Sequence, residues 1–191
     1  MSSVRVERDG VVLRVTMARP ERRNAFDAGL IAELAEAFGD VGDTRAVVLT
    51  GEGASFSAGA DIDWMRSSVE LDHDENVADA LRLRALLEAI DGCPAPVVAA
   101  VQGHAFGGGC GLVACCDVAV AAPDARFAFS EVKLGIVPAV ISPFALAKIG
   151  SSAARRWFVT GERFDATVAL RIGLVHELAD DLAAAVDRVV G

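Results

Sequence analysis

FSAGADI (residues 56–62) and GHAFGGGCG (residues 103–111) are two glycine-bearing stretches, and each follows an apolar run of β character and precedes a helix-like segment. A glycine turn that opens a helix exposes unpaired backbone N–H groups at the positive end of the helix dipole. Two such turns that converge form an oxyanion hole, which stabilises negative charge on a carbonyl oxygen. The pair therefore predicts carbonyl chemistry and an acid or base elsewhere in the chain.

The composition favours one domain with a sizeable core. The chain has 191 residues, of which 53% are hydrophobic, and this length suits a single domain. No apolar run approaches the roughly 18–20 residues that a membrane span needs, and the first residues carry no apolar signal core. The formal net charge of −9 argues against a nucleic-acid partner. We therefore expect a cytoplasmic protein with neither a membrane nor a nucleic-acid partner.

Strand-like and helix-like segments alternate along the chain, which is typical of the α/β class. A β-hairpin is expected around Asp9-Gly10, and Asp27 is expected to cap a helix. Buried strands are expected at 46–50, 97–101 and 118–121, and helical stripes at 30–38, 77–90 and 182–190. We interpret residues 1–142 as the core and residues 143–191 as a helical C-terminal part of the same domain. The polar segment 72–76 is expected to be an exposed, mobile loop.

The cysteines and histidines predict no metal centre. Cys110 and Cys115 lie in an apolar, helix-like stretch, and Cys115 and Cys116 are adjacent. This pattern favours reduced, buried thiols over a disulfide framework or a zinc site, and Cys93 is included in that interpretation. The three histidines are too scattered in sequence to bind a metal. Among them, His104 adjoins the second glycine stretch, and we expect it to pack the loop rather than to catalyse.

Glu131 is the candidate acid or base. It stands among apolar residues in FAFSEVKLGI (residues 127–136), just after a strand-like segment. A carboxyl group there would be partly desolvated, which raises its pKa and suits proton transfer near neutral pH. The alternative is a surface glutamate paired with Lys133 or Arg126.

The glycine stretches leave a structural alternative open, because glycines also permit close packing of a helix on a strand. Other nucleotide and nucleophile motifs fit less well. The spacing of residues 103–111 does not match the dinucleotide-binding fingerprint, and no Gly-Lys-Ser/Thr follows to make a P-loop. The chain also has no Gly-x-Ser-x-Gly elbow.

Five segments, in this order and spacing, resemble the enoyl-CoA hydratase/isomerase (crotonase) superfamily. The resemblance covers essentially the whole chain. The segments are ARPERRNAF (18–26), VVLTG (47–51) leading to FSAGAD (56–61), PVVAAVQG (96–103) leading to GGGC (107–110), CDVA (116–119), and SEVKLGIVP (130–138).

The resemblance implies a specific fold and site. The family fold is a ClpP-like spiral of β-β-α units with a helical C-terminal region, assembled as homotrimers or as hexamers made of two trimers. The family's oxyanion donors correspond to the N–H groups of Ala60 and Gly108, and its general acid/base corresponds to Glu131. Acyl-CoA is the implied partner, and no metal or redox cofactor is implied, because coenzyme A is part of the substrate. The implied substrate-binding residues are Ala58, Asp61, Ile62, Arg22, Gly107 and Gly111, with Arg22 and Arg23 resembling positions near the CoA phosphates.

The chain departs from the family pattern at Gly111. The best-known hydratases carry two glutamates, and the first stands where this chain has Gly111, while the second corresponds to Glu131. The flanking sequence resembles a bacterial subgroup associated with hydration of branched 3-methylglutaconyl-CoA and isohexenylglutaconyl-CoA, and a glycine at this position is compatible with that subgroup. The resemblance therefore implies an enoyl-CoA hydratase.

Two other functions remain open. A single glutamate also suits a Δ3-Δ2-enoyl-CoA isomerase, because one base can move a proton between two carbons on one face. A non-catalytic acyl-CoA-binding homologue is the second alternative, and the presence of Glu131 beside both glycine stretches weighs against it. Family members also continue into further helices that help to close the acyl pocket and build the trimer, so the helical C-terminal region is expected to be shortened here.

Overall fold

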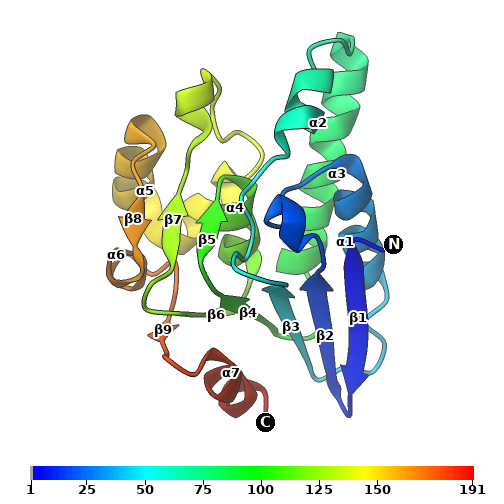
Figure 1. Cartoon of the computed structure of the whole chain (residues 1–191), viewed down its shortest axis with the longest axis vertical. Coiled ribbons are helices and arrows are strands. Elements are labelled where there is room, and N and C mark those ends of the chain that lie inside the picture. The colour runs from blue at the N-terminus through cyan, green and yellow to red at the C-terminus, as the bar shows by residue number, and fades with distance from the viewer. Residues whose placement is uncertain (1) are drawn as a thin grey trace.

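The computed structural model describes residues 2–191. A six-stranded sheet has the order β1-β2-β3-β4-β6-β9, in which β1 and β2 form the predicted antiparallel hairpin and the remaining pairs are parallel (Figure 1). A smaller sheet has the order β5-β7-β8. The strands of the large sheet are β1 (Val4–Asp9), β2 (Val12–Met17), β3 (Ala46–Gly51), β4 (Val97–Val101), β6 (Val118–Ala121) and β9 (Glu177–Leu178). Those of the small sheet are β5 (His104–Phe106), β7 (Arg126–Ala128) and β8 (Phe164–Asp165).

Helices cover both faces of the large sheet, which explains why its central strands read as continuous apolar runs. All five residues of β4 are buried. The helices are α1 (Ala28–Gly39), α2 (Ile62–Ser67), α3 (His73–Asp91), α4 (Gly108–Cys115), α5 (Ser142–Thr160), α6 (Ala166–Arg171) and α7 (Leu182–Val190), with short 3-10 turns η1 (Pro20–Arg22) and η2 (Glu131–Leu134). The α/β class predicted from the sequence is therefore confirmed.

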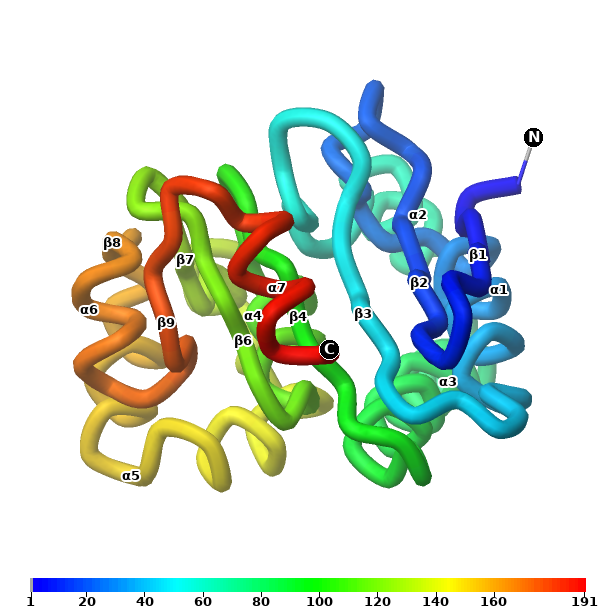
Figure 2. Tube along the Cα trace, turned by 90° about the horizontal axis from the view of Figure 1, so that it is seen from below, coloured from blue at the N-terminus to red at the C-terminus, as the bar shows by residue number. Residues whose placement is uncertain are grey.

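Alternate residues of β3, β4 and β6 belong to two separate apolar clusters. On one face, residues such as Val47 and Leu49 join the main core with α1, α3, α4 and α5. On the other face, Val48 and Val98 pack with Ala185 and Val186 of α7. Figure 2 shows α7 crossing this face, where it contacts β4 and β6.

The start of α3 corrects the sequence prediction, because residues 72–76 do not form a loop. Asp72 caps the helix by accepting a hydrogen bond from the Glu75 N–H, and the Glu75 side chain accepts one from the Asp72 N–H. This capping box lets a polar segment begin a helix. The predicted stripe of α3 is also buried only in its second half: Val77 is exposed, whereas Leu87 and Ile90 are buried.

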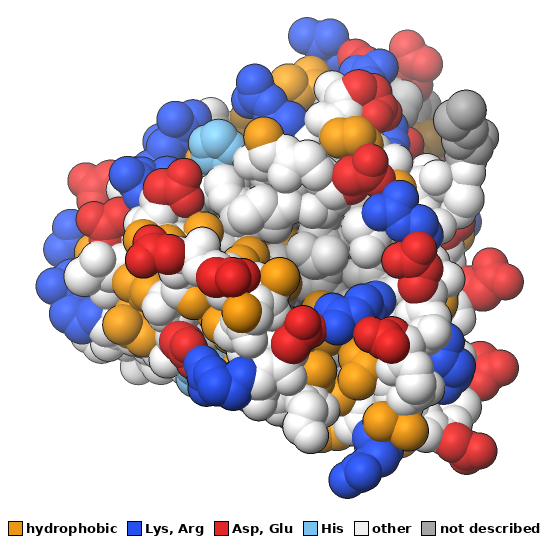
Figure 3. Space-filling view, turned by 60° about the horizontal axis from the view of Figure 1, so that its bottom comes forward, with side chains coloured by type: hydrophobic (Ala, Val, Ile, Leu, Met, Phe, Trp, Pro, Cys, Tyr) orange, Lys and Arg blue, Asp and Glu red, His pale blue; other side chains and the backbone are white. Residues whose placement is uncertain are grey.

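The four cysteines are free, and Cys110, Cys115 and Cys116 are buried, as predicted, whereas Cys93 is only half-buried. Within residues 2–191, no group of three or more His, Cys, Asp or Glu side chains is placed to hold a metal ion. No helix in this described part combines the length and apolar character that crossing a membrane requires. Figure 3 shows acidic and basic side chains interspersed over one face of the molecule.

Candidate active site

The two glycine turns meet, as the sequence predicts. The Ser57 N–H donates to the His104 oxygen at 2.9 Å, and the Phe106 N–H donates to the Ser57 oxygen at 3.0 Å. These bonds pair Ser57 with Ala105 in a short parallel bridge. The turn before α2 and the turn before α4 are therefore fixed to each other by backbone.

Glycines at the contact allow this close approach. A Cβ atom at Gly59, whose φ is +89°, would lie 2.8 Å from the Phe106 oxygen. A Cβ at Gly109 would lie 2.8 Å from the Ser57 oxygen. Each turn thus occupies the space that a side chain on the other would need, which supports the packing alternative for these glycines.

The N–H of Ala60 points away from Phe26, the residue with which Ala60 forms an isolated β-bridge. The Phe26 N–H donates to the Gly59 oxygen at 2.7 Å, and the Asp61 N–H donates to the Phe26 oxygen at 2.8 Å. Along an extended segment successive N–H groups point to opposite sides, so the Ala60 N–H is directed to the other side, where Ala60 lines a cavity. Among residues 2–191 it has no backbone acceptor.

Gly108 of the second turn lines the same cavity. Gly108 is the first residue of α4, and Gly107 before it has φ +50° and provides no side-chain cap. The first N–H groups of a helix lack intrahelical acceptors and lie at the positive end of its dipole. Gly108 and Ala60 line one cavity of about 170 Å³, so the two predicted donors are brought together.

Glu131 begins η2 and lines this cavity with both donors. Burial raises the pKa of its carboxyl group. Its Oε2 atom is buried without a hydrogen-bond partner in the described chain, and its Oε1 lies 3.3 Å from the position of a Cβ on Gly107. The alternative of a surface glutamate paired with Lys133 or Arg126 is wrong: no ion pair of Glu131 occurs in residues 2–191, and Arg126 donates to the oxygens of Asp124 and Ala125.

The rest of the cavity is apolar. Its wall consists of Phe26, Trp64, Leu83 and residues 136–141, and Glu131 is the one titratable residue that lines it. A carboxylate in such surroundings has little competition from water or other charges, which favours proton transfer to a bound molecule.

The predicted substrate-binding residues in and near the first turn do not line this cavity, and they differ in exposure. The Ala58 N–H donates to the Arg23 oxygen at 2.9 Å, and Ile62 is 61% exposed. Arg22 is exposed and pairs with Asp63 at 3.0 Å. Asp61 is buried, where it caps α2.

Gly111 lies beneath a side chain that the sequence analysis did not single out. A Cβ at Gly111 would lie 2.5 Å from Cγ2 and 3.0 Å from Cβ of Ile141. Ile141 lines the cavity, whereas Gly111 is buried behind it. A glutamate at position 111 would therefore need the space that Ile141 occupies.

Sequence reasoning missed a polar network that supports the first turn. Arg19 lies 2.7 Å from the Asp27 carboxylate and 3.5 Å from that of Asp61. Asn24 is fully buried and donates to the oxygens of Glu52 and Ser55. The signal was present in the stretch ARPERRNAF, where polar residues precede an apolar helix start.

His104 has the packing role that the sequence predicts. Its Nδ1 lies 3.1 Å from the Ser55 hydroxyl, and its ring lies 4.9 Å from that of Phe106. Burial lowers its pKa, and nearby arginines lower it further. His104 is not among the residues that line the cavity of Glu131.

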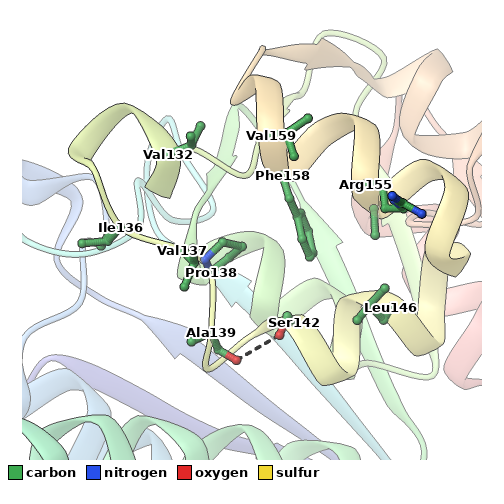
Figure 4. Close-up of a pocket in the computed structure, with 11 residues that line it drawn as sticks. Val132, Ile136, Val137, Pro138, Ala139, Ser142, Leu146, Arg155, Phe158 and Val159 are labelled. Atoms are coloured by element: carbon green, nitrogen blue, oxygen red, sulfur yellow. Dashed lines mark hydrogen bonds between the residues drawn. The ribbon is translucent and has the colours of Figure 1, made fainter.

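A second, larger cavity of about 490 Å³ lies between η2 and α5 (Figure 4). Its apolar lining includes Val132, Leu146, Phe158 and Val159, and residues 136–139 separate it from the cavity of Glu131. In Figure 4 the Ser142 hydroxyl donates to the Ala139 oxygen, which fixes one end of this wall. Arg155 is the one titratable residue of its lining, so the larger cavity offers no carboxyl group comparable to that of Glu131.

Two free N–H groups, a desolvated carboxyl group and an apolar cavity define the class of site that stabilises an enolate derived from a carbonyl compound. A model of the family described as enoyl-CoA hydratase/isomerase matches residues 7–188. The chain belongs to this enoyl-CoA hydratase/isomerase family.

The individual relatives of this chain support the same family assignment. The chain is 39% identical over 179 residues to a Thermus thermophilus protein named as an enoyl-CoA hydratase, covering 92% of this chain and 70% of that protein. It is 37% identical over 172 residues to the enoyl-CoA hydratase AKT6-1 of Alternaria alternata, covering 88% of this chain and 56% of that protein. A solved enoyl-CoA hydratase from Shewanella pealeana superposes with a TM-score of 0.95 at 41% identity, covering 98% of this chain and 72% of that chain. The chain thus spans between 56% and 72% of these three proteins.

Proposed function

We propose that this chain is an enoyl-CoA hydratase that adds water across the 2,3 double bond of a 2-enoyl-CoA thioester. One observation carries the proposal: the unpartnered carboxyl group of Glu131 shares a cavity with the free N–H groups of Ala60 and Gly108. The names of the relatives support the same activity.

The geometry supports a mechanism with one carboxyl group. The thioester oxygen accepts hydrogen bonds from Ala60 and Gly108, and the ionised Glu131 takes a proton from water as the water oxygen bonds to C3. The π electrons of the double bond move to the thioester oxygen as an enolate, which the two donors stabilise. Glu131 then returns the proton to C2, so that the net change is the addition of one water molecule.

The remaining features of the proposal follow from this chemistry and from the family. The reaction transfers no electrons to an acceptor, so it needs no redox cofactor, the family resemblance implies no metal, and coenzyme A enters as part of the substrate. The backbone of Ala58, Asp61 and Ile62 would line the CoA moiety, with Arg22 near its phosphates. Gly107 would act at the reacting end through its contact with Glu131, and Gly111 through the space that it leaves for Ile141. We also propose a cytoplasmic homotrimer or a hexamer of two trimers, on the family resemblance.

An isomerase is a second candidate function, and one observation favours it. Ile141 fills the space over Gly111, so the described cavity holds one carboxyl group rather than two. Moving a double bond from the 3 to the 2 position needs one base that removes a proton from C2 and returns it to C4. A non-catalytic acyl-CoA-binding protein would need neither the free Oε2 of Glu131 nor its desolvation.

Turnover of two substrates by the wild type and Glu131→Gln tests the proposal. With a 2-enoyl-CoA, we expect the wild type to remove the conjugated thioester absorbance, and the variant to lose about 10²–10⁴-fold in kcat while still binding acyl-CoA. A gain of that absorbance from a 3-enoyl-CoA, with no loss from the 2-enoyl-CoA, would establish the isomerase instead. Glu36→Gln, on the exposed side of α1, is the matched control and should keep full turnover. Undiminished activity of Glu131→Gln would disprove the mechanism.

A further inference from the structure

We propose that Phe26 is the positioning residue that sets the distance between the two oxyanion donors, its backbone placing Ala60 and its ring placing Gly108. The inference rests on the proposed function, because it concerns the donors that hold the thioester oxygen. Phe26 lies just before α1, far in sequence from both donors, and lines the same cavity as they do.

The backbone of Phe26 holds the first donor. Its N–H and its oxygen bond to Gly59 and Asp61 at 2.7 and 2.8 Å. These two bonds enclose Ala60 on both sides, in a parallel bridge between Phe26 and Ala60. The direction of the Ala60 N–H is therefore fixed by the position of the Phe26 main chain.

The ring of Phe26 holds the second donor. A Cβ on Gly108 would lie 2.5 Å from Cε2 and 2.8 Å from Cδ2 of the ring. The ring thus lies directly against the Gly108 Cα, with no room for a side chain between them. Phe26 is 1% exposed, so the surrounding core keeps the ring in this place.

One residue therefore links two donors that come from separate turns. The turns also pair through Ser57, but that bridge lies behind the donors, whereas Phe26 contacts the donor residues themselves. Removing most of the ring would leave Gly108 without support on the cavity side. A displacement of about 1 Å in a catalytic group costs on the order of 10²-fold in rate, and losing one donor costs about 10²–10³-fold.

The carbonyl stretching frequency of a bound thioester reports the two hydrogen bonds directly. We would measure it by isotope-edited infrared spectroscopy of butyryl-CoA, which is saturated and does not react, and compare kcat and KM for a 2-enoyl-CoA. Phe26→Ala should shift the bound frequency toward its value in water and lower kcat about 10–100-fold, with KM changed less than about threefold. Phe26→Leu, which keeps part of the contact, should lie between the wild type and Phe26→Ala, and it carries the test if the alanine variant does not fold.

Phe38→Ala and Phe38→Leu are the matched controls. Phe38 is also a buried core phenylalanine of the same cluster, on α1, but it does not line the cavity. These variants should lower the melting temperature without moving the carbonyl frequency or kcat. The inference is overturned if folded Phe26 variants keep the wild-type frequency and kcat, or if the Phe38 variants shift them equally. A wild type that neither turns over a 2-enoyl-CoA nor shifts the butyryl-CoA carbonyl would overturn the proposed function, and this inference with it.

Discussion

The two glycine turns face the same cavity but are held in place differently. The first turn relies on polar side chains: Ser57 donates to the Asn24 oxygen at 2.8 Å, and Asp61 caps α2 and pairs with Arg19. The second turn has fewer polar side-chain contacts, among them His104 Nδ1 at 3.1 Å from the Ser55 hydroxyl, and its helix α4 begins without a side-chain cap and is buried along nearly its whole length. It is held by contact at glycine Cα atoms, including Gly108 and Gly109.

This difference predicts how each turn should respond to mutation. Hydrogen bonds and ion pairs can be weakened gradually, because a partner of similar shape retains part of the interaction. Contacts at a glycine Cα change abruptly, because even one methyl group forces backbone apart. The second turn should therefore be the less tolerant of the two.

Among the variants that compare the two turns, Gly109→Ala should have the largest effect on turnover. The new methyl group would lie 2.8 Å from the Ser57 oxygen, a backbone atom that moves only if the two turns separate. We expect a loss of about 1–3 kcal/mol in the free energy of unfolding and a fall of about 10²-fold in kcat. Chemical denaturation and steady-state turnover measure the two effects.

The control for this variant is Gly39→Ala at the end of α1, where nothing lies within 4 Å of the new methyl group. It should be nearly neutral in both measurements. If Gly109→Ala kept wild-type turnover, the contrast between the two turns would fail.

Gly111→Ala should lower the free energy of unfolding somewhat less, because the atoms that its methyl group would meet belong to a side chain rather than to backbone. Its methyl group would lie 2.5 Å from Cγ2 of Ile141, and we expect a loss of about 1–2 kcal/mol. Ile141→Ala alone should cost about 2–5 kcal/mol by leaving a cavity. In the double variant the methyl group enters that cavity, so the combined loss should be smaller than the sum by about 1 kcal/mol or more. Simple additivity in a double-mutant cycle would show that the two residues do not share this space.

Asp61→Asn should have a smaller effect, on the first turn. Asparagine still caps a helix, and Arg19 keeps its closer partner Asp27 at 2.7 Å. We expect a loss of about 1 kcal/mol and turnover within about threefold of wild type. Asp61→Ala, which also removes the cap, should cost about 1 kcal/mol more. An Asn variant as inactive as Gly109→Ala would remove the distinction between the turns.

The free energy of unfolding should depend slightly on pH through Glu131, which belongs to neither glycine turn. Burial raises the pKa of Glu131, so the folded protein holds this proton more tightly than the unfolded chain. The stabilisation that results is complete below the ordinary glutamate pKa of about 4.3 and is lost as the pH rises through the raised pKa. Glu131→Gln should therefore unfold at a higher denaturant concentration than wild type at pH 7, and the difference should vanish near pH 4. Equal stability of the two proteins at pH 7 would contradict a desolvated carboxyl group.

Much of the fold could be predicted because its signals are local. The strands at 46–51, 97–101 and 118–121 are short apolar runs between turn residues, and such runs suit strands covered on both sides. Asp27 caps α1 as expected. The start of α3 was misread because Asp72 and Glu75 look like loop residues until their reciprocal hydrogen bonds are recognised.

The residues that meet at the candidate site could be predicted from the sequence, but the contacts that support them could not. Ala60, Gly108 and Glu131 stand in recognisable stretches, and the structure brings them to one cavity. The contacts of Arg19 with Asp61 and of Ile141 with Gly111 join residues distant in sequence. Their pairing depends on the tertiary packing, to which composition and spacing give no guide.

The position of α7 has a consequence for how the chain is synthesised. Its residues cover valines from β2, β3, β4 and β6, and Arg14 pairs with Asp187 at 2.6 Å across 173 positions of sequence. While the ribosome is still translating residues 182–190, this valine-rich face of the sheet has no cover. Contacts between such distant residues form late and slowly, and exposed apolar strands aggregate readily. The nascent chain therefore depends on α7, or on a chaperone until α7 emerges, to keep one side of its sheet out of water.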